Sequence, residues 1–246
     1  MRPDGAYGVV EGMTANGWPG APIRYKYADL WSVTLHTSAA GAKVVAMENG
    51  AEARVVGHGA GTQVVVQPTQ GRDAFTARSI LGDTLTIAGS SGGTPFRQLT
   101  AQNVADILIN AAADDAVQAD DVVKIESTPE GTALTVVTGT GIDTVVAGDG
   151  SLNLDSLRGP VHVQDAELTI YDQNNPHTPT LDPQTQALRR TTYRLSDHEL
   201  VRIAPDGRQT VPIRYWNLSQ LWLFTGNDGN LISVTAAPIW TGSGPR

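Results

Sequence analysis

The sequence predicts a mainly β protein built from sandwich-like or barrel-like modules, with one α+β unit that contains a single amphipathic helix. Three observations predict this fold class. Glycine and proline supply 26 and 14 of the 246 residues, and so many turn formers suit many short strands. Short alternating or β-branched runs recur along most of the chain. Only residues 99–113 carry the apolar spacing of a helix.

The first third of the chain is expected to form an N-terminal β module over residues 1–78. Residues 1–22 contain several glycines and prolines with little periodicity, which indicates an extended arm. The Asn-Gly pair at 49–50 is a strong hairpin signal between two predicted strands. The strands of this module are expected at 30–36, 42–47, 53–57 and 62–67.

The predicted helix over 99–113 is the centre of the next unit. Val104, Ile107 and Leu108 follow the i, i+3, i+4 spacing of one helical face. Thr100 suits the N-cap position, because its hydroxyl can accept a hydrogen bond from an amide of the first turn. The apolar face must be buried, and the neighbouring segments all read as strands. The helix is therefore expected to pack against β-structure.

Strands flank the predicted helix on both sides and complete an α+β unit over residues 79–155. The Thr-Pro-Glu-Gly turn at 128–131 predicts that the two strands after the helix form a hairpin. The strands of this unit are expected at 79–81, 84–88, 121–127 and 133–138.

Residues 156–246 are expected to form a C-terminal β module. The polar loop at 172–186 contains three prolines, which exclude it from a central strand. Loops of this length in compact domains usually carry function or make contacts. The strands are expected at 161–163, 167–171, 191–195 and 199–203.

Composition and charge argue against several classes of partner. The absence of cysteine removes disulfides, thiolate metal sites and thiol nucleophiles. The net charge is −8 and the basic residues are scattered, so no nucleic-acid partner is expected. No apolar run approaches the length that crosses a bilayer, and Met1 is not followed by the apolar segment of a secretory signal. No membrane partner is expected.

One motif resembles a catalytic centre. Residues 89–93 match the G-x-S-x-G pattern of a nucleophile elbow, with Ser91 as the nucleophile and Asp165 and His198 in the order of a hydrolase triad. The elbow requires a helix directly after the serine, whereas a Gly-Gly-Thr-Pro segment follows Ser91. The sequence therefore predicts no catalytic residue and no enzymatic activity.

A second motif resembles a metal site. Residues 138–146 are similar to the calcium-binding nonapeptide of repeats-in-toxin proteins, in which calcium lies between several stacked turns. Only one and a half such repeats are present, so a Gly-rich strand connection is expected, with calcium at residues 139–143 as the alternative. The five histidines lack the paired spacing of zinc sites. Neither a metal nor another cofactor is predicted.

The tryptophans are the candidate contact residues. Trp31 and Trp222 lie in apolar, strand-like settings and are expected in the core. Trp18 and Trp240 lie in Gly- and Pro-rich ends, so they are the predicted interface residues. We also expect residues 1–20 and 239–246, which hold these two tryptophans, to contact neighbouring subunits.

Stretches such as 133–141 (Ala-Leu-Thr-Val-Val-Thr-Gly-Thr-Gly) and 232–238 (Ile-Ser-Val-Thr-Ala-Ala-Pro) are typical of the whole chain. In this composition the chain resembles structural proteins of tailed-bacteriophage virions, namely tail components and capsid decoration proteins. The resemblance implies a virion subunit, assembled in the host cytoplasm, that acts through contacts with copies of itself and with other virion proteins. The alternative is a surface or secreted glycan-binding β module.

Overall fold

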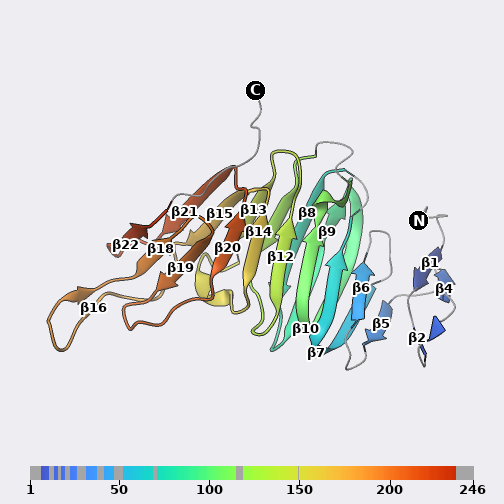
Figure 1. Ribbon diagram of the computed structural model, residues 1–246, viewed down its shortest axis with the longest axis horizontal. Coiled ribbons are helices and arrows are strands. Elements are labelled where there is room, and N and C mark those ends of the chain that lie inside the picture. Colours follow the sequence, from blue (N-terminus) through green and yellow to red (C-terminus); the bar gives the residue numbers. More distant parts are fainter. Residues whose placement is uncertain are drawn as a thin grey trace.

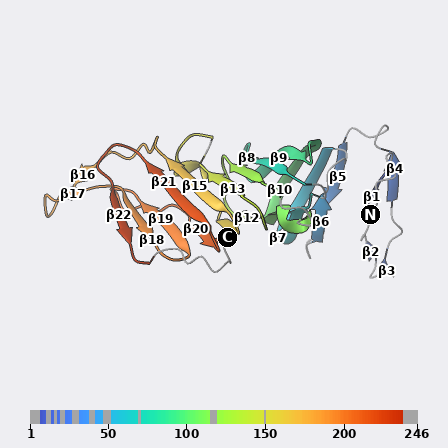
Figure 2. The ribbon, with the colours of Figure 1, turned by 90° about the horizontal axis from the view of Figure 1, so that it is seen from above.

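The computed structural model describes residues 32–37, 42–46, 52–68, 71–114, 119–148 and 150–236, with the backbone alone at 7–10, 14–15, 18–19, 23–26, 59–60 and 113–114. Over these residues the chain is mainly β, and no helix reaches seven residues. The predicted mainly β fold class is confirmed. One large sheet folds over into two layers around a shared core (Figures 1 and 2).

The chain winds into a coil of successive turns, and consecutive strands of each turn lie in alternate layers. Each strand pairs in parallel with the equivalent strand one turn away. The first layer contains β8 (Asp73–Ser79), β11 (Val122–Ile125), β13 (Thr144–Ala147), β15 (Glu167–Asp172) and β21 (Gln220–Thr225). The second layer contains β6 (Ala42–Ala46), β12 (Ala133–Val137), β14 (Val161–Gln164) and β20 (Ile213–Trp216), together with the C-terminal parts of the long strands β7 (Glu52–Val66) and β10 (Thr94–Asn110). Such a coil is a parallel β-solenoid, in which each turn stacks on the one before.

The N-terminal turns of the coil have a regular length. Ser32 of β5 (Ser32–His36) pairs with Glu52 of β7, and Ala42 of β6 pairs with Thr62 of the same strand. Both pairs advance the chain by 20 residues. Later turns are longer because they carry insertions, and the largest insertion lies between β15 and β20.

The core consists of inward-facing aliphatic side chains that stack in register from turn to turn. Stacking places each side chain against its equivalent in the next turn, and each fully buried large aliphatic contributes about 1.5–3 kcal/mol. One ladder of the second layer runs through Val64, Ile107, Leu134, Val161 and Ile213, all buried. Its counterpart in the first layer runs through Phe75, Val123, Val145 and Leu168.

Strand β9 (Thr84–Ser91) joins the two layers near the N-terminal end of the sheet. It pairs antiparallel with β8 on one side and with β10 on the other. Gly92 and Gly93 have φ values of 52° and 79°, which allow the tight turn from β9 into β10. The rings of Phe75 and Phe96 meet edge to face at 5.3 Å inside this bend.

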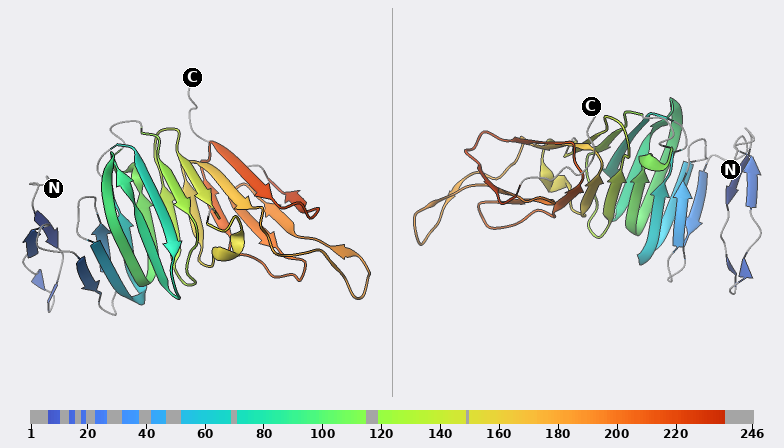
Figure 3. Two further views of the ribbon diagram at one scale, coloured as in Figure 1. Left: turned by 180° about the vertical axis from the view of Figure 1, so that it is seen from behind. Right: turned by 45° about the horizontal axis from the view of Figure 1, so that its top comes forward.

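The C-terminal part extends the second layer beyond β20. There β19 (Glu199–Ile203) pairs antiparallel with β20 and with β18 (Thr192–Leu195), and β22 (Leu231–Val234) pairs in parallel with β18. The hairpin of β16 (Thr180–Leu181) and β17 (Leu188–Arg189) extends away from this end (Figure 3). The remaining elements are η2 (Leu154–Ser156), β1 (Tyr7–Val10), β2 (Thr14–Ala15), β3 (Trp18–Pro19) and β4 (Ile23–Lys26).

The helix predicted over residues 99–113 is wrong. Residues 94–110 form strand β10, and only the short 3-10 turn η1 (Ala111–Asp114) follows. The unit predicted over 79–155 therefore contains strands and 3-10 turns where an α-helix was expected. Its boundaries, and the division into 1–78, 79–155 and 156–246, stay predictions. Within the described residues, no helix is long and apolar enough to span a membrane.

A bulge in β10 explains the helical spacing. Asn103 has a φ of 51°, and the register with β7 shifts on both sides of Val104. The shift changes the phase of the strand, so Ala101, Val104 and Ile107 all face inward at intervals of three residues. This interval imitates one face of a helix. Strands β7, β9 and β12 bond to the β10 backbone, and these long-range pairs override the local pattern.

The predicted hairpin over residues 121–138 is also wrong. Its two strands, β11 and β12, lie in different layers and pair with β8 and β13 and with β10 and β14, respectively. The turn at 128–131 carries the chain from one layer to the other. Residues 49–50, the other hairpin signal, lie outside the described residues, and the flanking strand β6 pairs in parallel with the far half of β7.

Candidate assembly surface

Two of the terminal strands of the folded sheet come late in the chain. The path of hydrogen-bonded strands begins at β21, which pairs with β15, and finishes at β22, which pairs with β18. Among the described strands, each has an open edge on its other side. Both edges lie at the end of the molecule opposite the N-terminal strands (Figures 1 and 2).

Strand β21 presents an aromatic strip on the outer face of the first layer. Its sequence alternates, so that Leu221 and Leu223 pack against the core while Trp222 and Phe224 point outward. Trp222 is 49 % exposed. The Phe224 ring lies 5.2 Å from the ring of Tyr171 on β15, which orients it on the sheet. A large apolar surface therefore reaches solvent along an open edge.

Strand β22 is apolar on both faces. Leu231, Ile232 and Val234 are each more than half exposed. Soluble proteins usually protect open edges with lysine, proline or a covering segment, because unpaired backbone groups bind other strands. Neither β21 (Gln-Leu-Trp-Leu-Phe-Thr) nor β22 (Leu-Ile-Ser-Val) contains a charged residue or a proline. We call the exposed side chains of these two strands the assembly surface.

A further exposed tryptophan lies on the outer face of β20. The Trp216 ring meets the His162 ring of β14 edge to face at 5.8 Å. Burial is the main cause that lowers the pKa of His162, the Arg214 charge lowers it further, and Asp106 acts in the opposite direction. A lowered pKa keeps the imidazole neutral near pH 7, so it packs as an uncharged ring beneath Trp216.

The structure places only part of the predicted contact residues. Trp222 was expected in the core, and this prediction is wrong because the ring lies on the outer face of a terminal strand. The backbone of Trp18 lies in β3, but its side chain is not among the described side chains. Trp31 and Trp240 lie outside the described residues. The interface role of Trp18 and Trp240 stays a prediction.

The nucleophile-elbow motif, residues 89–93, lies at the end of β9 and in the turn that follows it. Ser91 ends β9, is fully buried, and pairs with Asp73 of β8 and Thr94 of β10. The Gly-Gly turn after it begins a hairpin, whereas a nucleophile elbow joins a strand to a helix. His198 lies at the surface beside Asp197, with 3.3 Å between Nε2 and a carboxylate oxygen. Asp165 receives a hydrogen bond from the Asn217 amide.

The calcium-like motif contributes a buried carboxylate to the coil. The amide of Asp121 donates to Asp143 Oδ1 at 2.9 Å, and the amide of Asp73 donates to Asp121 Oδ1 at 2.7 Å. Each carboxylate thus binds a backbone amide in the neighbouring turn of the first layer. No group of three or more metal-ligating side chains is present within the described part of the chain.

Comparison with protein-family models, with curated proteins and with solved structures finds no match to this chain.

Proposed function

We propose that the chain is a structural subunit of a tailed-bacteriophage virion, in the tail or on the capsid, and that it joins copies of itself through the assembly surface. The observation that carries the proposal is the pair of open, uncharged, apolar edge strands β21 and β22. An open strand offers backbone donors and acceptors that pair well with another strand. Contacts with other virion proteins and a location in the virion belong to the same proposal.

A second copy fits the β21 edge by symmetry. An antiparallel pair of β21 strands, related by a two-fold axis at Leu223, places Trp222 of one copy opposite Phe224 of the other on the outer face. The two-fold axis then gives two equivalent Trp222–Phe224 pairs, one on each side of Leu223. Cross-strand aromatic pairs contribute about 0.5–1.5 kcal/mol each beyond the area that they bury. The sequence of β21 is thus complementary to itself.

Light scattering coupled to size-exclusion chromatography tests the proposal. The wild-type chain is expected at a multiple of its 26.0 kDa mass. Trp222→Lys is expected to remove the β21 contact and lower the assembled mass, because it removes one aromatic partner and places a charge on that edge. Electron microscopy of the assembled fraction should show closed bodies of one size.

The matched control is Leu81→Lys, which replaces an equally apolar and more exposed side chain in the turn between β8 and β9. It changes the net charge as Trp222→Lys does but leaves both edges intact. A wild-type chain that stays monomeric would overturn the proposal. An assembly that resists Trp222→Lys would show that β21 is not the contact.

A further inference from the structure

A cavity of about 350 Å³ opens beside η2 and the connection from β19 to β20. None of its lining residues belongs to the assembly surface. Leu154, Leu157, Ala204 and Val211 supply apolar wall, while arginine, histidine and carboxylate side chains supply the polar part. The volume lies in the lower part of the range for small-molecule sites, roughly 300–1,000 Å³.

The base of this cavity is a fixed ionic network. Arg202 is only 2 % exposed, and its guanidinium donates to Asp155 and, at 2.8 Å, to Asp172. Asp172 also accepts from the Tyr193 hydroxyl at 2.6 Å and from the Leu154 amide at 2.9 Å. Arg202 Nε has no acceptor within the described residues. These bonds therefore hold Arg202 in one geometry at the floor of the cavity, and its Nε remains a donor without an acceptor among the described residues.

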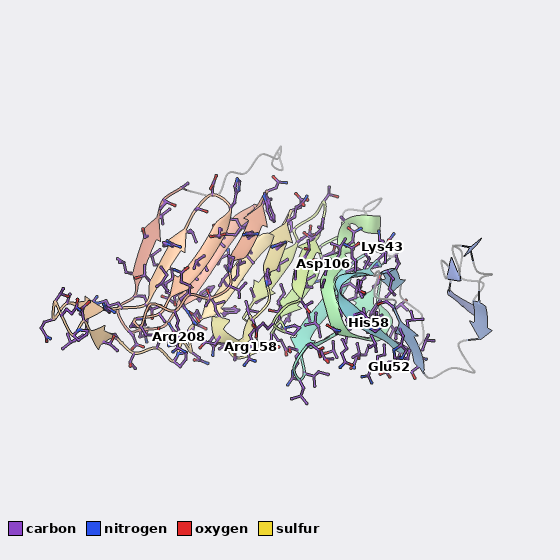
Figure 4. The ribbon with its side chains drawn as sticks, turned by 60° about the horizontal axis from the view of Figure 1, so that its bottom comes forward. Lys43, Glu52, His58, Asp106, Arg158 and Arg208 are labelled. Atoms are coloured by element: carbon purple, nitrogen blue, oxygen red, sulfur yellow. The ribbon has the colours of Figure 1, made fainter. Side chains whose placement is uncertain are left out.

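The rim of the cavity carries cationic groups that are less fully paired. Arg158 takes part in no ion pair within the described part of the chain, whereas Arg208 uses its Nε to donate to Asp206 at 2.6 Å. Arg158 and Arg208 lie along the same edge of the folded sheet (Figure 4). His177 belongs to the long loop after β15, and its Nε2 lies 3.5 Å from Asp155 Oδ1. Cationic side chains from three separate segments thus line the same cavity.

The cavity lining holds three arginines but only two carboxylates, those of Glu130 and Asp155. Asp155 is already bound to Arg202, and Asp206 to Arg208. Glu130 lines the cavity and forms no ion pair within the described residues. Gln209 adds an amide that can both donate and accept. Such a site suits a ligand with a carboxylate for the arginines and hydroxyls for Glu130 and Gln209.

We propose that the cavity binds an acidic saccharide through one uronic or sialic acid unit. The carboxylate of the sugar would contact Arg158 and Arg208, and its hydroxyls would contact Glu130 and Gln209. The apolar walls would cover the carbon faces of the ring. This site is independent of the assembly surface, so a structural subunit could carry it as well.

Isothermal titration with glucuronate, galacturonate and N-acetylneuraminate tests this site, each beside a neutral sugar of similar size and beside acetate. At least one acidic sugar is expected to bind saturably and roughly tenfold more tightly than its neutral counterpart or acetate. Arg158→Ala and Arg208→Ala are each expected to weaken binding by about tenfold or more. Their melting temperatures should stay unchanged, because both arginines are exposed.

The matched control is Arg194→Ala, an exposed arginine of β18 that lies outside the cavity lining, and its affinity should equal that of the wild type. Absence of saturable binding by all three acidic sugars would overturn the proposal. Equal affinity for neutral sugars or for acetate would overturn the assigned ligand class. Binding that survives both arginine substitutions would place the site elsewhere.

Discussion

At the scale of single residues, the most demanding interaction is the burial of Arg202 between Asp155 and Asp172. Removing a guanidinium and a carboxylate from water costs several kcal/mol per ion, and only good pairing geometry offsets it. Asp172 meets that condition, because its two oxygens accept from Arg202, Tyr193 and a backbone amide. Even so, burial as the largest cause raises the pKa of Asp172, while Arg202, Tyr193 and the amide oppose the rise.

Asp172→Ala is expected to destabilise the fold by about 3–5 kcal/mol, because it leaves the Arg202 charge buried with one partner fewer. Chemical denaturation followed by tryptophan fluorescence measures the loss. Asp197→Ala is the control, since that carboxylate is partly exposed and its partner is the surface ring of His198. The control should lose less than about 1 kcal/mol. Equal losses would mean that the network does not hold the fold.

The pKa of Asp182 is shifted downward, in the opposite direction to that of Asp172. Hydrogen bonds from the Thr185 amide, the Arg189 side chain and the Gln184 amide lower its pKa from 3.8 to about 2. A depressed pKa makes the contribution to hairpin stability complete above pH 3.8, and it is lost as pH falls through about 2. Carboxyl NMR should give this midpoint, and Arg189→Ala should raise it. A wild-type midpoint near 3.8 would contradict the contacts.

At the scale of elements, β10 shows how a strand can carry a helical pattern. Before its bulge Leu99 and Ala101 face inward, and after it Ile107 and Ile109 do so. Each half alternates as a strand should, but the bulge joins the halves out of phase. A reading that looks for one period across residues 99–113 therefore finds spacings of three and four. The branched residues Val104, Ile107 and Ile109 favour a strand and were the local sign of it.

Ile107→Ala and Leu108→Ala separate the two interpretations of this segment. In the strand Ile107 is fully buried in a core ladder, whereas Leu108 is only partly buried. Ile107→Ala is expected to lower the free energy of unfolding by about 2–5 kcal/mol, as for other buried large-to-small changes. Leu108→Ala should cause a clearly smaller loss in the same urea titrations. A larger loss for Leu108→Ala would contradict the orientation of β10.

At the scale of the whole molecule, the sequence predicts strands well and their partners poorly. Alternation is a local pattern, so it predicts strands at 42–47 and 133–138, and these bounds nearly match those of β6 and β12. Parallel pairing joins residues a full turn or more apart, as with Val64 and Ile107, and no local pattern encodes it. Exposure of Trp222 depends in the same way on where the sheet ends. The Arg202 network was missed because its members lie 47 and 30 residues apart.

Salt should favour assembly of the whole molecule. Each copy carries a net charge of −8, so copies repel one another as they approach, whereas the edge strands that meet are uncharged. Added salt shortens the Debye length from roughly 10 Å at 0.1 M to 3 Å at 1 M, and this stronger screening removes much of the repulsion between copies. The contact itself is apolar and is not weakened by the same ions. Sedimentation velocity should therefore give a larger assembled fraction as sodium chloride rises across this range. Trp222→Lys should assemble less than the wild type at every salt concentration, and an assembly that dissociates in salt would indicate ion pairs in place of apolar edges.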